Sequence, residues 1–210
     1  AVRFNMASER IDNLKEYYNL IKEAKEQGAD FIKIMTTGLL DFNNHGKVTG
    51  VPLSKEEVKE MVHIAHEEGM AVMSHTNGVF GVQTAIEAGV NSVEHGNYID
   101  EETIRMMASS DTVWVPTLVT VRNLKGCDRY EDAVLQPIIE RAEENLKLAY
   151  RYKAKVALGS DAGAYKVMHG QGIEDEYQAF QKILGLSEQV DTWLRAGEQK
   201  IRDTFKHPQF

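Results

Sequence analysis

Short apolar segments alternate with amphipathic helical patterns along most of this chain. The predicted strands are residues 29–35, 70–74, 90–94, 112–118 and 155–159. The middle strands start roughly every 21 residues, a spacing that favours parallel strands joined by right-handed helical crossovers. The fold class is therefore α/β, either a (β/α) barrel or a doubly wound open sheet. No glycine-rich phosphate motif follows the first strand, which disfavours the dinucleotide-binding version.

Several helix boundaries are marked by capping residues. Ser54 is followed three residues later by Glu57, which predicts a capping box, and Asp100 is expected to cap another helix. Residues 36–53 form a Gly- and Asn-rich loop whose length is typical of a functional loop. The first helix is predicted over residues 9–27, with a buried stripe made of Ile11, Leu14, Tyr18 and Ile21.

The composition excludes several classes of function. The net charge of −8 argues against nucleic acid as the main partner, because proteins that bind its backbone present a basic face. The one cysteine, Cys127, permits neither an intrachain disulfide nor a zinc site built from thiolates. No apolar run approaches the length of a membrane span and no signal peptide opens the chain, so we expect no membrane partner and a cytoplasmic location.

Four polar residues occur where predicted strands end: Lys33, His75, His95 and Asp161. Parallel strands place their carboxyl ends on one rim, where α/β enzymes carry their chemistry. Each residue alone has a simpler interpretation. Lys33 could pair with an acid, the histidines could be hydrogen-bonded core residues, and Asp161 could cap a helix. A metal centre would explain all four together, because charge at a buried strand end is costly unless it is paired.

Five short motifs in this order resemble the amidohydrolase superfamily, most closely its branch of prolidase-like metallodipeptidases and imidazolonepropionase-related enzymes. The resemblance extends from about residue 10 to residue 186. It implies a partial TIM (β/α) barrel, comprising strands four to eight as a parallel sheet with outer helices. The motifs are Phe31-Ile-Lys-Ile-Met35, Ser74-His-Thr-Asn-Gly78, Ser92-Val-Glu-His-Gly96, Pro116-Thr-Leu118 and Gly159-Ser-Asp-Ala-Gly163.

The resemblance also implies a role for each candidate residue. Lys33 would be carboxylated, its carbamate bridging two divalent metals, usually zinc. His75 and His95 would hold the second metal. Asp161 would contact the first metal and act as the catalytic base for the attacking water. His169, in the loop after the last predicted strand, is a candidate substrate-binding residue, and Tyr98 either lines the same pocket or has a structural role.

The chain departs from the family in one important respect. The family's His-x-His pair, which holds the first metal from strand one, occurs nowhere in this sequence. His63 and His66 are three residues apart on a predicted helix and cannot replace it. The family's first three strands and its small β-sandwich are also absent. We therefore expect residues 1–186 to be an incomplete barrel and residues 187–210 a helical tail.

The expected function is metal-dependent hydrolysis of amide or peptide bonds in small substrates such as dipeptides, weak or absent in this chain alone. One alternative is a catalytically silent barrel fragment that acts as a scaffold, and another is a lactone or phosphotriester hydrolase. Five strands of a barrel leave two open edges, which invite pairing with another chain. We therefore expect a homo-oligomer or association through these edges.

Overall fold

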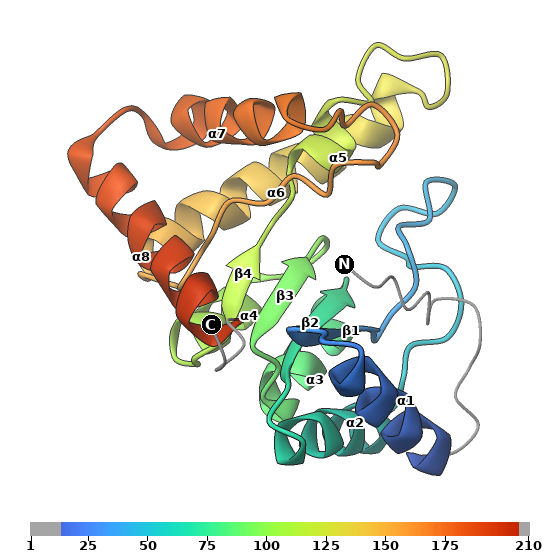
Figure 1. Cartoon of the computed structure of the whole chain (residues 1–210). Coiled ribbons are helices and arrows are strands. Elements are labelled where there is room, and N and C mark those ends of the chain that lie inside the picture. The colour runs from blue at the N-terminus through green and yellow to red at the C-terminus, as the bar shows by residue number, and fades with distance from the viewer. Residues whose placement is uncertain (1–13, 206–210) are drawn as a thin grey trace.

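The structure, a computed structural model, describes residues 14–205. Four strands form one sheet in chain order, and each pair is parallel. This arrangement confirms the predicted α/β class with a parallel sheet and outer helices (Figure 1). The strands are β1 (Phe31–Met35), β2 (Ala71–Thr76), β3 (Ser92–His95) and β4 (Val113–Val115).

The fifth predicted strand, residues 155–159, is reduced to one parallel bridge between Trp114 and Val156. The Trp114 N–H donates to the Lys155 carbonyl at 2.8 Å, and the Ala157 N–H donates to the Trp114 carbonyl at 3.0 Å. The prediction of a full strand here is therefore wrong. β4 itself has only three residues, so it offers little length for a fifth strand to pair with.

Four helices cover one face of the sheet: α1 (Leu14–Glu26), α2 (Lys55–Glu67), α3 (Val79–Ala88) and α4 (Glu101–Ala108). Ile34, Val72 and Val93 belong to the main core that lies between these helices and the sheet. α2 starts with the predicted capping box of Ser54 and Glu57. α4 starts with Asp100, whose side chain accepts a hydrogen bond from the Thr103 N–H.

The buried stripe of α1 differs from the predicted one. Tyr17 is 0% exposed, whereas Leu14 and Tyr18 are 44% and 38% exposed. The buried positions are Tyr17, Ile21 and Ala24, which follow one face of a helix with 3.6 residues per turn. The predicted start of this helix at residue 9, and Ile11, lie outside the described residues.

The second half of the chain adds α5 (Val119–Arg122), α6 (Asp132–Arg151) and α7 (Gln171–Leu184). The short α5 was not predicted, because four residues are too few for a periodic pattern. Val121 of α5 and Leu124, two residues after it, pack with Leu135, Ile138 and Ile139 of α6 in a second cluster. These three helices lie above the sheet in Figure 1, beyond the carboxyl ends of its strands.

The last helix, α8 (Glu188–Thr204), crosses the face of the sheet opposite to α1–α4. Ile201 packs on a small cluster formed by Val113, Val115 and Ala157. Phe205, just after the helix, makes an edge-to-face contact with Phe31 at 5.4 Å between ring centroids. α8 therefore reaches from the strand-five segment to β1 across what we call the concave face of the sheet.

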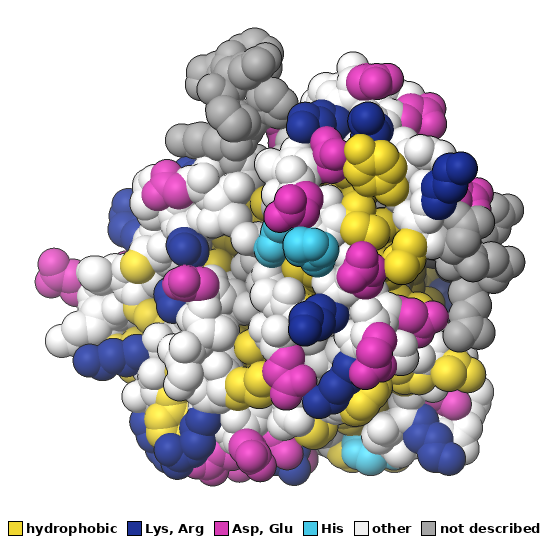
Figure 2. Space-filling model, turned by 90° about the horizontal axis from the view of Figure 1, so that it is seen from below, with side chains coloured by type: hydrophobic (Ala, Val, Ile, Leu, Met, Phe, Trp, Pro, Cys, Tyr) yellow, Lys and Arg dark blue, Asp and Glu magenta, His cyan; other side chains and the backbone are white. Residues whose placement is uncertain are grey.

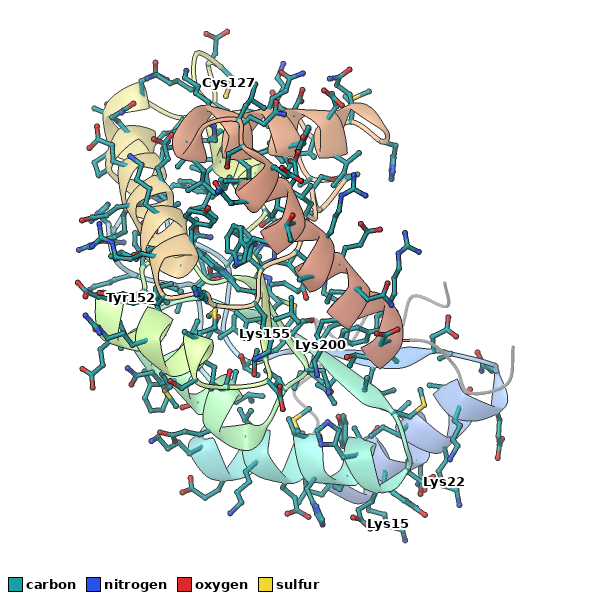
Figure 3. All side chains as sticks on the ribbon, turned by 90° about the vertical axis from the view of Figure 1, so that its left-hand side faces the viewer. Lys15, Lys22, Cys127, Tyr152, Lys155 and Lys200 are labelled. Atoms are coloured by element: carbon teal, nitrogen blue, oxygen red, sulfur yellow. The ribbon has the colours of Figure 1, made fainter. Side chains whose placement is uncertain are left out.

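Charged side chains lie where α8 packs on the strand-five segment, near the amino end of β4. Figure 3 shows Lys155 and Lys200 close together, one at the start of the strand-five segment (residues 155–159) and one on α8. Both ammonium groups lie near the Asp111 carboxylate, at 3.6 and 3.7 Å. Asp111 is largely exposed, so these pairs contribute little to stability.

Acidic and basic side chains are interspersed on the face of the molecule seen in Figure 2, without a broad basic patch on that face. None of the helices within residues 14–205 is long and apolar enough to cross a lipid bilayer.

Candidate functional site

The strand register places several candidate residues on the concave face. Met35 is paired with His75, and His75 is paired with Glu94. Lys33 shares the face of Met35, because side chains two apart on a strand point the same way. Lys33 was predicted to lie at the end of its strand, but it lies in the middle of β1, and its side chain is exposed. The strand continues beyond it for two residues, Ile34 and Met35.

His95 reaches the same place by an unusual backbone conformation. Strand alternation from Glu94 would direct its ring to the opposite face. Its φ of 73° is in the left-handed region, and the rings of His75 and His95 meet with centroids 4.5 Å apart and planes at 63°. The indole N–H of Trp114 donates to the His95 carbonyl at 2.8 Å, which holds the turned backbone. The structure thus brings the two histidines together.

One ring nitrogen of each histidine is occupied by a protein contact. His75 Nε2 lies 3.2 Å from the Gly38 carbonyl oxygen, where it can only donate. His95 Nδ1 lies 2.7 Å from Thr117 Oγ1. Among the described residues, Nδ1 of His75 and Nε2 of His95 make no hydrogen bond, so they remain for another ligand. Metal-binding histidines are commonly oriented in this way, by a hydrogen bond from the second ring nitrogen.

Burial keeps both imidazoles neutral at pH 7. It lowers the pKa of His75, an effect opposed by the Gly38 carbonyl and reinforced by Lys33. Burial lowers the pKa of His95 to about 3, with further lowering by His75 and Lys33. A neutral imidazole has a free lone pair, which is the form that binds a metal.

Glu94 is a site residue for which the sequence interpretation assigned no role. It is 9% exposed on the concave face, and Ser92 Oγ donates to its Oε1 at 2.5 Å. Burial raises its pKa, while Ser92 and the charge of Lys33 lower it and the charge of Asp161 raises it again. Its position opposite His75 in the strand register was the available signal, since both alternate onto one face.

Asp161 lies in the loop after the strand-five segment, exposed and with a φ of 54°. The charge of Asp161 raises the pKa of His75, whereas that of Lys33 lowers the pKa of both His75 and His95. His169 is exposed, and its Nε2 lies near Gly163, 3.8 Å from where an added Cβ would be. Asp161, predicted at a strand end, thus lies in the same loop region as His169, which was predicted in that loop.

Tyr98 lies just beyond β3, half-buried and in a left-handed conformation with a φ of 61°. Its ring meets that of His45 from the long loop at 5.2 Å. Burial raises the pKa of its hydroxyl. Tyr98 thus joins the loop after β1 to the loop after β3. Within residues 14–205, its ring does not contact the rings of His75 or His95.

Aromatic contacts link the loops at the carboxyl end of the sheet. Phe42, from the long loop, stacks on Tyr130 with ring centroids 4.4 Å apart. Arg129 lies over two rings, 5.3 Å from the centroid of Tyr130 and 4.9 Å from that of Tyr165. We call Phe42, Arg129, Tyr130 and Tyr165 the aromatic bridge. It connects the loops that follow β1, α5 and the strand-five segment.

Within residues 14–205, no three His, Cys, Asp or Glu side chains lie close enough to hold a metal ion by themselves. The two histidines would therefore need at least one further ligand to complete a metal site on the concave face. A separate cavity of about 490 Å³ lies between α5 and α7, lined by residues that include Arg122, Lys166 and Lys182. None of the predicted site residues lines it.

Comparison with known proteins agrees with the resemblance seen in the sequence. Residues 2–181 match the model of the amidohydrolase family. Ochratoxinase from Aspergillus niger is 27% identical over 155 residues, covering 71% of this chain and 32% of the relative. An uncharacterized protein from Mycobacterium tuberculosis is 31% identical over 139 residues, covering 63% of this chain and 37% of the relative.

Solved structures share the fold. A Xaa-Pro dipeptidase with bound methionine superposes with a TM-score of 0.65 and 28% identity, over 88% of this chain and 48% of the other. The Aspergillus niger ochratoxinase structure has a TM-score of 0.73 at 23% identity, over 90% of this chain and 43% of the other. The chain therefore spans less than half the length of these proteins.

Proposed function

The chain belongs to the amidohydrolase family, and on this premise we propose that it is the strand-four-to-eight part of a metal-dependent hydrolase acting on amide bonds of small substrates. The observation that carries this proposal is the histidine pair. His75 and His95 are buried and neutral, and each keeps one ring nitrogen free for a ligand. Residues 1–186 would carry the hydrolase portion, and residues 187–210 a helical tail.

The donor set on the concave face fits a divalent metal such as zinc if Lys33 supplies an oxygen. Zinc sites in enzymes use three protein ligands, commonly imidazole nitrogen and carboxylate oxygen. Carboxylation of Lys33 would convert an ammonium group into an anion with two oxygens. The positive charge of an unmodified Lys33 disfavours a cation beside the histidines, so modification and metal binding would reinforce each other.

When bound, a divalent metal polarises a carbonyl oxygen and lowers the pKa of water to about 7. The protein residues would do the rest of the work. Asp161, exposed in the loop beyond the sheet, would take the proton of the attacking water and pass it to the leaving amine. Gly38 and Thr117 would hold the two imidazoles in their orientation. The charges of Lys33 and Asp161 both act on the Glu94 carboxyl group, so Glu94 would be available to interact with either side chain.

Small dipeptides are the substrates that the comparisons favour. One neighbour with 28% identity is a Xaa-Pro dipeptidase, and ochratoxinase is a curated relative. His169 and Tyr98 belong to the loops at the carboxyl end of the sheet and are the proposed substrate contacts. The aromatic bridge includes Tyr165, from the same loop as His169, and would limit the size of the substrate.

The second candidate is a scaffold without catalytic activity. The absence of a His-x-His pair favours it, because that pair supplies half the ligands of the first metal in the family. Under the hydrolase proposal the chain should bind one metal, weakly, and turn over slowly. Under the scaffold proposal it should bind a metal without any turnover.

Metal titration of the 210-residue chain separates these possibilities. Zinc should bind with a stoichiometry of one, more tightly in bicarbonate, and ¹³C-bicarbonate should give a carbamate signal that Lys33→Ala removes. His75→Ala and His95→Ala should abolish binding, whereas His63→Ala, on the outer helix α2, is the matched control and should not. Zinc binding that survives loss of either histidine would refute the proposed site. Hydrolysis of Xaa-Pro dipeptides by the loaded chain then distinguishes enzyme from scaffold.

A further inference from the structure

A buried carboxyl group on α7 is hydrogen-bonded to a backbone turn far away in the sequence. Glu176 is 0% exposed. Its two carboxyl oxygens accept hydrogen bonds from the backbone N–H groups of Leu118 and Val119, both at 2.9 Å. α5 begins there without a side-chain cap of its own, so Glu176 satisfies N–H groups that the helix start leaves free.

Within residues 14–205, no cation forms an ion pair with Glu176. Arg122 is the cation whose charge acts on it, but the Arg122 guanidinium forms an ion pair with Glu143 instead. A buried acid is costly unless it is hydrogen-bonded. Since the hydrogen bonds of Glu176 to Leu118 and Val119 go to the same turn, holding that turn is the role that the contacts support.

The residue before this turn is strained and contacts the candidate site. Thr117 has a φ of 49°, a left-handed conformation that is rare for a β-branched residue. Such conformations persist only when the surroundings enforce them. Thr117 is 3% exposed, and its Oγ1 lies 2.7 Å from Nδ1 of His95. The N–H groups fixed by Glu176 are those of the next two residues along the chain.

We propose that Glu176 is a positioning residue for His95, acting through the turn at Thr117. Its carboxyl group fixes the Leu118 and Val119 N–H groups, the turn then holds the Thr117 hydroxyl against Nδ1 of His95, and Nε2 is left directed into the site. The inference rests on the proposed function only in treating His95 as a ligand. The positioning itself concerns the protein without metal.

Nitrogen-15 NMR of the histidine rings tests the positioning directly in the metal-free 210-residue chain. The chain has seven histidines, and a His95→Gln variant assigns the signals of that ring. Wild-type His95 should show one neutral tautomer with a proton on Nδ1. Glu176→Ala removes both acceptors, and Glu176→Gln keeps the shape while replacing one acceptor by a donor. Both should give averaged shifts of two tautomers, as should Thr117→Val, whereas Thr117→Ser should retain the wild-type signals.

Phe180→Leu is the matched control, because Phe180 is as buried as Glu176 and lies on the same helix. It should lower thermal stability and leave the His95 signals unchanged. Unchanged His95 signals in folded Glu176→Gln would overturn the inference, and this variant is the more conservative if Glu176→Ala does not fold.

Zinc affinity separates this inference from the proposed function. Loss of a group that orients a metal-binding histidine typically costs about 10–100-fold in affinity, so Glu176→Gln should weaken zinc binding by at least tenfold. A changed tautomer with unchanged zinc affinity would support the positioning role and contradict the role of His95 as a ligand. An unchanged tautomer with weakened binding would contradict the positioning role.

Discussion

Adding a methyl group at Gly197 tests the contact of α8 with the sheet. A Cβ at this position would overlap the carbonyl oxygen of Val156 and lie 2.5 Å from its carbonyl carbon. Non-bonded carbon atoms prefer separations of about 3.5–4.0 Å. The obstructing atoms are backbone atoms of the strand-five segment, so no side chain can turn aside, and the helix itself must move.

Two effects of Gly197→Ala oppose each other. Alanine in a helix is favoured over glycine by about 1 kcal/mol, while overpacking costs typically 1–3 kcal/mol, about 3 kcal/mol where backbone blocks the new group. Burial of Gly197 against Val156 makes the second effect the larger one. We expect a net loss of about 2 kcal/mol in the free energy of unfolding.

Urea unfolding followed by tryptophan fluorescence measures this loss, because Trp193 is on α8 and Trp114 is on β4. Ala196→Gly is the control, since Ala196 is the exposed neighbour on the same helix. It should lose only the propensity difference of about 1 kcal/mol. A Gly197→Ala variant more stable than the wild type would show that α8 does not pack on the strand-five segment, and the reasoning would be refuted.

Three further predictions concern separate parts of the fold. Burial raises the pKa of Glu176 to about 7 from its ordinary 4.5, so its contribution to stability is full below pH 4.5 and is lost as the pH rises through 7. Relative to wild type, the free energy of unfolding of Glu176→Gln in urea should therefore rise by about 3 kcal/mol between pH 4.5 and pH 8. An equal difference between the two proteins at both pH values would contradict this. Ser54→Ala removes the capping box of α2 and should cost about 1 kcal/mol in the same assay, with the adjacent Lys55→Ala as a near-neutral comparison. A double-mutant cycle of Phe42→Ala and Tyr130→Ala should give a coupling energy of about 0.5–1.5 kcal/mol for their stacked rings; additive effects would mean that the two loops are not joined in solution.

Parts of the fold with strong local signals were predictable from the sequence. The order of the first four strands with the helices between them, their parallel pairing and the caps at Ser54 and Asp100 are confirmed. The predicted buried stripe of α1 was wrong because two tyrosines, Tyr17 and Tyr18, are adjacent in the sequence. Hydrophobicity alone does not indicate which of the two is buried. Tyr17 is the buried one, although its hydroxyl has no hydrogen-bond partner within residues 14–205.

The prediction of a full strand over residues 155–159 was wrong for a different reason. Its Val-Ala-Leu pattern is typical of a buried strand, but pairing requires a neighbour of matching length. β4 ends at Val115, before Pro116, which has no N–H to donate to a ladder. Strand existence here depends on tertiary partners and not on local pattern.

The residue types of the candidate site could be predicted from the sequence, but their arrangement in space could not. Lys33, His75, His95 and Asp161 were found from motifs, and their roles remain proposals. The contact between the two histidines depends on the left-handed backbone of His95. Such a conformation at a residue other than glycine cannot be predicted from a sequence pattern. Gly96 was the nearest signal, since a Cβ there would lie 2.7 Å from the indole nitrogen of Trp114 that holds the His95 carbonyl. Thr117 and Glu176 were missed because their contacts join distant segments.

The position of α8 has a consequence for the order of events in folding. β1, β2 and β3 pair with their neighbours in sequence, so the sheet and α1–α4 are built from contacts of moderate sequence separation. The contacts of Phe205 with Phe31 join opposite ends of the described chain, and loop-closure entropy makes such contacts slow to form. The half-barrel should therefore assemble first, with its concave face open to solvent, and α8 should dock as the final step. The histidine pair would be formed before the surface beneath it is covered.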